Sequence, residues 1–145
     1  MSLAVIDASI AIRAVLPISS DAELRLFRHL LETNTHLLAP DLWRTEITSV
    51  LRRYEYTQML SQEEADMSLE NLLSLPIEVV PVENETCKQA LTWARRLRHS
   101  KVYDAIYLVT AVNKDAEFWT ADERLWKRCR ELKLSWVKLS SDFRD

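Results

Sequence analysis

The 145-residue sequence predicts an α/β protein, a three-layer α/β/α sandwich around a mostly parallel central sheet. Two observations support this fold class. Short β-branched and apolar runs alternate with longer segments in which apolar residues recur every three or four positions, as expected when helices cover both faces of a parallel sheet. The first run, residues 3–6, is apolar throughout, which is typical of a strand buried on both faces.

The first half of the chain contains three of the predicted strands. Its elements, in order, are a strand at residues 2–6, helices at 8–16 and from about 21, a strand at 35–39, helices from 41 and from 61 to 76, and a strand at 77–82. Pro17 and Pro40 end the first helix and the second strand, because proline lacks a backbone N–H. The patterns Ser20–Glu23 and Ser61–Glu64 predict capping boxes at the starts of two helices.

The second half continues the alternation. Its elements are a long helix from about 83 to 98, a helix from about 102 to 114, a strand through residues 118 and 119, a basic helix from about 122 to 132, and a strand at 136–139. The sequence contains no internal repeat, low-complexity segment or linker. We therefore expect residues 1–145 to form a single domain with one core.

The composition excludes several classes of protein. The chain contains no glycine, so it has neither a phosphate-binding Walker loop, nor a GxGxxG dinucleotide turn, nor a GxSxG nucleophile elbow. Its two cysteines lack CxxC spacing and its three histidines lack HExxH spacing, which argues against a disulfide scaffold and a zinc site.

The N-terminus shows no secretory signal pattern, and the longest apolar runs are far shorter than the roughly 18 residues of a membrane span. We therefore expect no membrane association and a cytoplasmic location.

Four acidic residues carry most of the functional information: Asp7, Glu46, Asp104 and Asp122. Each lies against an apolar stretch, where an ionised side chain is stable only if it is paired, hydrogen-bonded or bound to a cation. Asp7 and Asp122 directly follow predicted strands, and ligands of open parallel sheets gather beyond the carboxyl ends of strands. Glu46 and Asp104 lie in helices that can lean over the same edge. Because converging carboxylates repel one another, this arrangement calls for a hard divalent cation such as Mg²⁺ or Mn²⁺.

Each acid alone also has a purely structural interpretation. Asp7 and Asp122 can cap the helices that follow them, Glu46 can pair with Arg44, and Asp104 can open a helix beside Lys101. The four contexts together are more informative.

In combination the contexts resemble the PIN-domain family, specifically the small VapC-type toxins of bacterial and archaeal toxin–antitoxin pairs. The resemblance runs through nearly the whole chain and rests on four stretches: Asp7-Ala8-Ser9 after the first strand, Pro40-x-Leu42-x-x-x-Glu46, Tyr103-Asp104-Ala105-x-Tyr107-Leu108-x-x-Ala111, and Trp119-Thr120-Ala121-Asp122-Glu123-Arg124-Leu125. The last two stretches are the most specific. The sequence departs from the family after Glu46, where many relatives carry an asparagine and this chain has Thr48 and Ser49.

The resemblance implies a metal-dependent endoribonuclease that hydrolyses RNA with activated water. It implies that the four acids bind one or two Mg²⁺ or Mn²⁺ ions as catalytic ligands, and that Ser9 and Thr120 orient ligands or bound water. Glu123 is a neighbour of less certain role. For partners, it implies a homodimer in complex with a small antitoxin whose tail covers the active-site groove.

Other functions of the same fold class fit less well. A haloacid-dehalogenase phosphatase requires a second aspartate two residues after the first, where this chain has Ser9. A response-regulator receiver requires an acidic pair after the first strand and an aspartate after the third, and neither is present. The alternative from another class is a non-catalytic module that keeps the fold and binds RNA or protein.

Charge is distributed unevenly along the chain. The net charge is −3, but residues 1–87 hold 6 basic and 14 acidic side chains, whereas residues 88–133 hold 11 basic and 6 acidic ones. A nuclease with an acidic metal site needs cations beside it to hold the flanking phosphates. The candidates in the basic segment are Arg95, Arg96, Arg98 and Lys101 before Asp104, and Arg124, Lys127, Arg128 and Arg130 after Asp122. Solvated helix faces explain the same pattern without a ligand.

Overall fold

The computed structural model describes residues 2–16 and 21–144 and confirms the predicted fold class. The sheet has five strands, all parallel, in the order β3-β2-β1-β4-β5. The strands are β1 (Leu3–Ile6), β2 (His36–Pro40), β3 (Ile77–Val80), β4 (Glu117–Thr120) and β5 (Val137–Leu139). The helices are α1 (Ala8–Val15), α2 (Asp21–Glu32), α3 (Leu42–Tyr56), α4 (Gln62–Leu73), α5 (Asn84–Leu97), α6 (Tyr103–Lys114) and α7 (Glu123–Glu131), followed by a 3-10 helix, η1 (Ser140–Asp142).

Local sequence signals account for most of these boundaries. The capping box at Ser61 is present, because Ser61 accepts a hydrogen bond from the backbone of Glu64 and the Glu64 side chain accepts one from the backbone of Ser61. The capping box expected at Ser20 lies outside the described residues. The third strand ends at Val80, two residues earlier than predicted, and no pattern in the sequence predicted η1.

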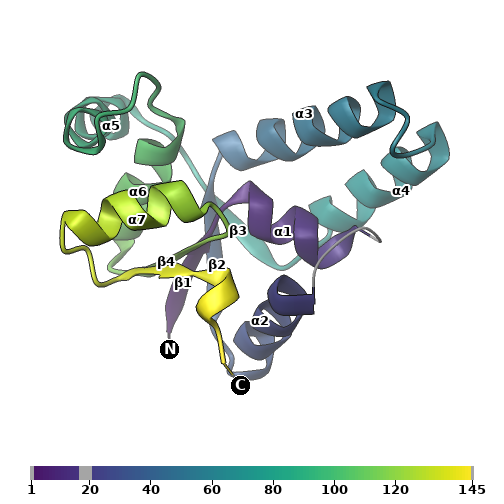
Figure 1. Ribbon diagram of the computed structural model, residues 1–145, viewed down its shortest axis with the longest axis horizontal. Coiled ribbons are helices and arrows are strands. Elements are labelled where there is room, and N and C mark those ends of the chain that lie inside the picture. Colours follow the sequence, from purple (N-terminus) through teal and green to yellow (C-terminus); the bar gives the residue numbers. More distant parts are fainter. Residues whose placement is uncertain (1, 17–20, 145) are drawn as a thin grey trace.

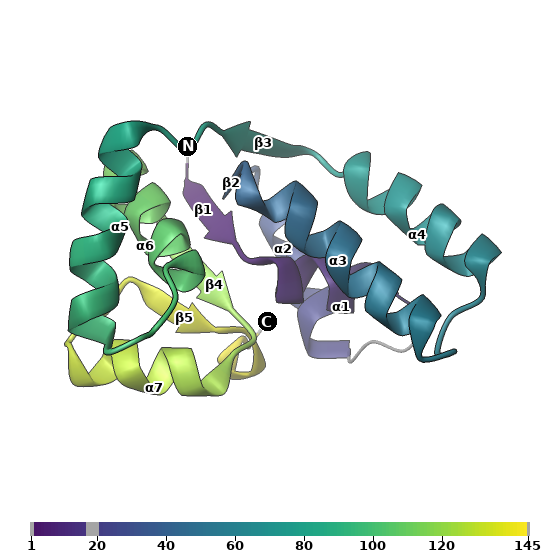
Figure 2. The same ribbon diagram turned by 90° about the horizontal axis from the view of Figure 1, so that it is seen from above.

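The helices form a layer on each side of the sheet. Figures 1 and 2 show α1 to α4 on one side and α5, α6 and α7 on the other. β1 is central and pairs with β2 on one side and β4 on the other, with Ile6 opposite Trp119. The chain therefore leaves β1 toward β2 and later returns to β4, which makes the carboxyl ends of β1 and β4 a topological switch point, the usual ligand site of such sheets.

The core lies on both faces of the sheet, and α6 contributes its longest buried segment. Seven consecutive residues of α6, 105 to 111, are buried, because this helix lies between α5 and strands β1, β2 and β4. Tyr107 stacks on Phe118 of β4 with ring centroids 5.9 Å apart. This packing fixes the position of α6, so that its first turn, with Asp104, reaches the edge of the sheet. No helix among the described residues has the length and apolar character needed to cross a bilayer.

Five helices end in the left-handed conformation without a glycine. The residues with positive φ are Asn34, Gln58, Arg98, Asp115 and Lys133, which follow α2, α3, α5, α6 and α7. Each of these ends is closed by the two backbone hydrogen bonds of a Schellman motif, such as His99 N to Ala94 O at 3.0 Å and Arg98 N to Arg95 O at 3.1 Å. Glycine usually occupies this position because a Cβ atom strains the left-handed conformation.

Candidate functional site

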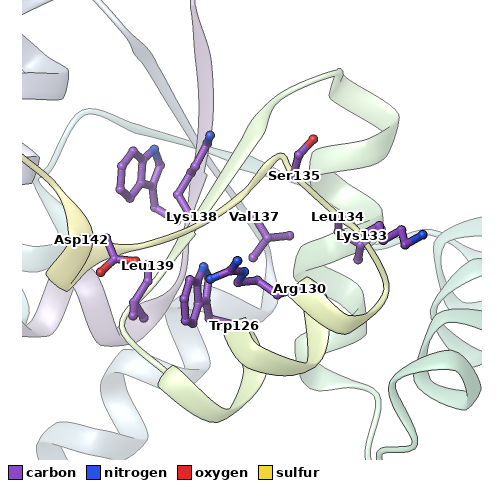
Figure 3. Close-up of a pocket in the computed structure, with 10 residues that line it drawn as sticks. Trp126, Arg130, Lys133, Leu134, Ser135, Val137, Lys138, Leu139 and Asp142 are labelled. Atoms are coloured by element: carbon purple, nitrogen blue, oxygen red, sulfur yellow. The ribbon is translucent and has the colours of Figure 1, made fainter.

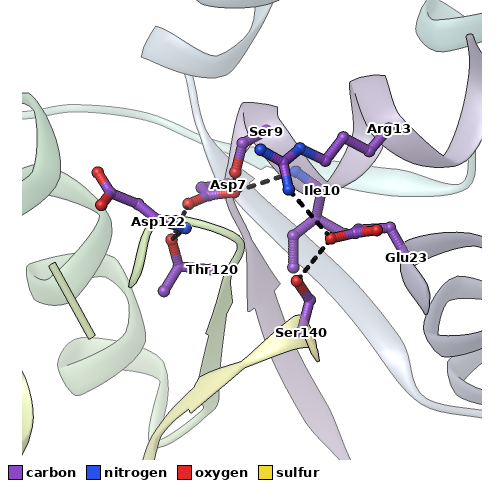
Figure 4. Close-up of polar contacts among 8 residues, drawn as sticks. All are labelled: Asp7, Ser9, Ile10, Arg13, Glu23, Thr120, Asp122 and Ser140. Atoms are coloured by element: carbon purple, nitrogen blue, oxygen red, sulfur yellow. Dashed lines mark hydrogen bonds and ion pairs between the residues drawn. The ribbon is translucent and has the colours of Figure 1, made fainter. Parts of the chain in front are cut away.

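Asp7 lies at the junction of β1 and α1 and joins this junction to β4. Its carboxylate caps α1 by accepting a hydrogen bond from the backbone N–H of Ile10 at 3.2 Å. It also accepts hydrogen bonds from the hydroxyl groups of Ser9 and Thr120, each at 2.5 Å (Figure 4). The carboxylate is therefore fixed by three donors, one of which comes from the neighbouring strand.

Asp122 caps α7 and is linked to Asp7 through Thr120. Its Oδ1 accepts hydrogen bonds from the backbone of Arg124 at 3.0 Å and Leu125 at 3.1 Å. Thr120 Oγ1 accepts the backbone N–H of Asp122 at 3.0 Å while it donates to Asp7. The capping roles read from the sequence for both aspartates are thus present, and they leave Asp122 Oδ2 without a hydrogen-bond partner among the described residues.

Glu46 and Asp104 come from the helical layers on opposite sides of the sheet. Glu46, on α3, accepts a hydrogen bond from the Tyr107 hydroxyl at 2.6 Å, and this bond links α3 to α6. Asp104, in the first turn of α6, lies 3.5 Å from Nδ1 of His99. Asp104 therefore opens its helix as the sequence suggested, whereas the partner found for Glu46 is Tyr107 and not Arg44.

The four acids line one cavity of about 320 Å³. Ser9, Tyr107, Arg13 and Arg53 also contribute to its wall. Residues separated by up to 115 positions in the sequence therefore meet at the switch point between β1 and β4. The predicted convergence of the four carboxylates on one edge of the sheet agrees with this geometry.

Burial makes this cluster of carboxylates reluctant to ionise. Burial raises the pKa of Asp7 to about 6, against 3.8 in a free side chain, although hydrogen bonds from Ser9 and Thr120 act in the opposite direction. Burial also raises the pKa of Glu46, and the nearby charges of Asp7 and Asp104 raise it further. The pKa of Asp104 is raised by burial and by Asp122, and lowered by His99. For these three carboxylates, burial outweighs the hydrogen bonds from Ser9, Thr120 and Tyr107 and the nearby His99.

A divalent cation fits this donor set by its chemistry. All four acids offer oxygen, which Mg²⁺ and Mn²⁺ prefer, and the Coulomb repulsion among them would be offset by a bound ion. Within residues 2–16 and 21–144, however, no group of three or more acidic, histidine or cysteine side chains is arranged so that it could already hold a metal ion. Three of the carboxylates make contacts within the protein: Asp7 with Ser9 and Thr120, Glu46 with Tyr107, and Asp104 with His99.

A protein-family model described as the PIN domain matches residues 4–131. The chain belongs to the PIN domain family. No curated protein sequence matches the chain.

Solved structures share the PIN domain fold at low sequence identity. The chain is similar to PAE2754 from Pyrobaculum aerophilum with a TM-score of 0.70 and 16% identity, covering 97% of this chain and 85% of the other. It is similar to VapBC2 from Rickettsia felis, solved with a DNA fragment from its promoter, with a TM-score of 0.66 and 12% identity, covering 94% and 96%. It is also similar to VapC20 of Mycobacterium tuberculosis, described as a sarcin–ricin loop cleaving toxin, with a TM-score of 0.61 and 15% identity, covering 81% and 87%.

The arginines predicted to bind RNA beside the site of this PIN domain differ in their surroundings. Arg98 and Arg124 line cavities that also contain Asp104 or Asp122. Arg96 instead stacks on the Trp93 ring at 4.2 Å. Arg128 also lines a cavity with Asp122, but its guanidinium donates to the backbone carbonyls of residues 96 and 97 and pairs with Glu131. The exposed Arg95 makes no contact with the acids within the part of the chain that the structure describes. The role of all five in RNA binding stays a prediction.

Sequence reasoning assigned no role to Arg13 and Arg53, which line the cavity, or to His99 and Tyr107, which contact Asp104 and Glu46. A helical-spacing argument could have found the two arginines. Arg13 is four positions after Ser9 and Arg53 is seven positions after Glu46, so each shares a helix face with a residue of the site.

A second and larger cavity of the PIN domain, about 490 Å³, lies at the outer edge of the sheet beside β5 and α7 (Figure 3). Trp119, Trp126, Arg130 and Lys138 are among the residues that line it, and none of the four acids does.

Proposed function

We propose that this PIN domain is a divalent-metal-dependent endoribonuclease and the toxin of a toxin–antitoxin pair. The observation that carries the proposal is the meeting of Asp7, Glu46, Asp104 and Asp122 around one cavity at the switch point of the sheet. Four converging carboxylates offer the oxygen ligands that Mg²⁺ or Mn²⁺ prefers, and such ions catalyse phosphodiester hydrolysis. Membership of the PIN domain family supports the assignment to nucleases.

The four acids would hold one or two Mg²⁺ or Mn²⁺ ions. When bound, such ions acidify water and offset the charge that develops on a phosphodiester during hydrolysis. The protein's own residues position the ligands. Ser9 and Thr120 hold the Asp7 carboxylate in place, and Tyr107 does the same for Glu46. Thr120 also accepts the backbone N–H of Asp122, so one residue contacts both aspartates.

RNA is the proposed substrate, and a small antitoxin is the proposed partner. The similarity to VapC20, which is described as cleaving the sarcin–ricin loop, supports RNA over DNA. The similarity to VapBC2, and to a toxin–antitoxin complex from Klebsiella pneumoniae, supports an antitoxin. We also propose that the protein acts as a homodimer in the cytoplasm.

Cleavage of RNA by the purified protein tests the proposal. We expect wild type to cut single-stranded RNA with Mg²⁺ or Mn²⁺ and to stop when EDTA is added, because the acids alone cannot activate water. Asp104→Asn and Glu46→Gln should abolish cleavage. Glu55→Gln is the matched control, since the half-buried Glu55 lies on the same helix as Glu46 but pairs with the exposed Arg52.

A second measurement separates the enzyme from the non-catalytic module. Mn²⁺ should raise the melting temperature of wild type in a concentration-dependent way, and Asp104→Asn should blunt the rise. RNA binding without metal-dependent cleavage, equal in wild type and Asp104→Asn, would favour the module. For the dimer, light scattering that gives a strict monomer across micromolar concentrations would contradict the proposal.

A further inference from the structure

A single arginine stands in the wall of the acidic cavity on the α1 side. Arg13 lies on the helix that Asp7 caps, and both residues line the cavity. The Arg13 side chain keeps 52% of its surface exposed. It therefore presents a positive charge to solvent beside four carboxylates that would otherwise repel an approaching phosphate.

A buried carboxylate holds Arg13 in position. Glu23, in the first turn of α2, is 2% exposed, and its Oε1 lies 3.3 Å from Nη1 of Arg13. The same oxygen accepts a hydrogen bond from the Ser140 hydroxyl at 2.9 Å, and Ser140 is itself buried in η1. Figure 4 shows this chain of contacts, from Ser140 through Glu23 to Arg13, beside Asp7. Three elements distant in sequence thus fix one guanidinium at the cavity.

The guanidinium keeps most of its donors for a ligand. The contact with Glu23 uses Nη1, whereas Nε and Nη2 have no hydrogen-bond partner among the described residues. Guanidinium groups bind phosphate through two parallel N–H donors, and a side chain that is already immobilised loses less conformational entropy on binding. Arg53 lines the same cavity from α3, but no carboxylate holds it among the described residues. Its guanidinium carbon instead lies 5.8 Å from the centroid of the Tyr54 ring.

We propose that Arg13, held by Glu23 and Ser140, binds the RNA phosphate next to the scissile one on the α1 side of the cavity. This inference rests on the proposed ribonuclease function. It places the RNA strand across the acids, from the Arg98 and Arg124 side to the α1 wall. Glu23 and Ser140 act through Arg13 and are positioning residues.

RNA binding in a cleavage-deficient background tests the inference. With Asp104→Asn present throughout, the affinity for a short single-stranded RNA is measured across a salt series. Adding Arg13→Gln should weaken binding about tenfold, as expected for one charged hydrogen-bonded contact, and should lower the salt slope by about 0.7. Arg13→Lys keeps the charge but loses the two parallel N–H donors of the guanidinium. It should therefore keep the salt slope and weaken binding less than Arg13→Gln does. Arg52→Gln removes an arginine that pairs with Glu55 outside the cavity, and it should change neither quantity.

The salt slope distinguishes a phosphate contact from a structural role. If Arg13 served only as the partner of Glu23, Arg13→Gln would lower stability without changing the slope. Should Arg13→Gln fail to fold, Arg13→Lys decides: affinity equal to the parent overturns the inference. Suppose that wild type cleaves RNA and the Asp104→Asn parent binds it. If folded Arg13→Gln in that parent then shows the same affinity and salt slope, the inference is overturned and the proposed function stays intact. Wild type that neither binds nor cleaves any RNA would refute the proposed function itself.

Discussion

Removing the charge of Asp7 should stabilise the metal-free protein at neutral pH, although Asp7 is a proposed catalytic ligand. Asparagine has the same shape and is an equally good helix cap, so Asp7→Asn can keep the hydrogen bonds from Ile10 and Ser9. Its amide nitrogen can donate to Thr120 Oγ1, whose second lone pair is free beside the bond from Asp122. The variant therefore loses the ionised group that burial disfavours, together with the acceptor of the buried Thr120 hydroxyl.

The size of the effect follows from the pKa of Asp7. An acid whose pKa is raised on folding, from 3.8 to about 6 for this residue, contributes stability at low pH that is lost as the pH rises through 6. Between pH 5 and pH 7.5 this group alone should lower the free energy of unfolding of wild type by about 1.4 kcal/mol. For a domain of this size that corresponds to a fall of about 5 °C in melting temperature. Asp7→Asn has no ionisable group at this position, so its free energy of unfolding should not show this fall.

Urea denaturation in EDTA, followed by tryptophan fluorescence at pH 5, 6 and 7.5, measures the difference. From pH 5 to pH 7.5, the free energy of unfolding of Asp7→Asn should rise by about 1.4 kcal/mol relative to that of wild type. Asp66→Asn, on the exposed surface of α4, is the control and should differ from wild type by a constant amount. The reasoning would be refuted if the difference in free energy of unfolding between Asp7→Asn and wild type did not change with pH. It would also be refuted if Asp7→Asn became less stable relative to wild type as the pH rises.

Two further substitutions test the surroundings of the site. Tyr107→Phe removes the hydroxyl that donates to Glu46 and should lower the free energy of unfolding by about 1 kcal/mol in the presence of chelator. Because this hydrogen bond lowers the pKa of Glu46, Mn²⁺-dependent thermal stabilisation of the variant should also begin at a higher pH than in wild type. Trp43→Phe removes a buried indole N–H that has no partner among the described residues, so its free energy of unfolding should stay within about 1 kcal/mol of wild type, whereas Trp43→Ala should cost about 3 to 5 kcal/mol.

The elements of the fold could be predicted because their signals are local. The apolar run before Asp7, the capping box at Ser61 and the helical spacing after Asp41 each specify a strand or helix within about ten residues. The order of the strands could not be predicted in the same way. The pairing of β4 with β1, which creates the switch point, depends on contacts between segments more than 100 residues apart.

The meeting of the acids at the sheet edge, with Ser9 and Thr120 beside them, could be predicted, but the contacts between distant helices could not. Asp7 and Asp122 follow strands directly, so their place at the sheet edge follows from the fold class. The bond from Ser140 to Glu23 joins residues 117 positions apart, and the bond from Tyr107 to Glu46 joins residues 61 positions apart. Such contacts depend on how the helical layers pack against the sheet, and no local pattern in the sequence encodes that packing.

The five helix ends that adopt the left-handed conformation without glycine have a consequence for the unfolded chain. A Cβ atom at Asn34, Gln58, Arg98, Asp115 and Lys133 costs the folded state about 1 kcal/mol at each position, less for asparagine and aspartate. The same Cβ atoms, with those at every other position, narrow the range of backbone conformations open to the unfolded ensemble, because glycine is the most permissive residue. The chain thus accepts strain at a few helix ends while losing less backbone entropy everywhere when it folds.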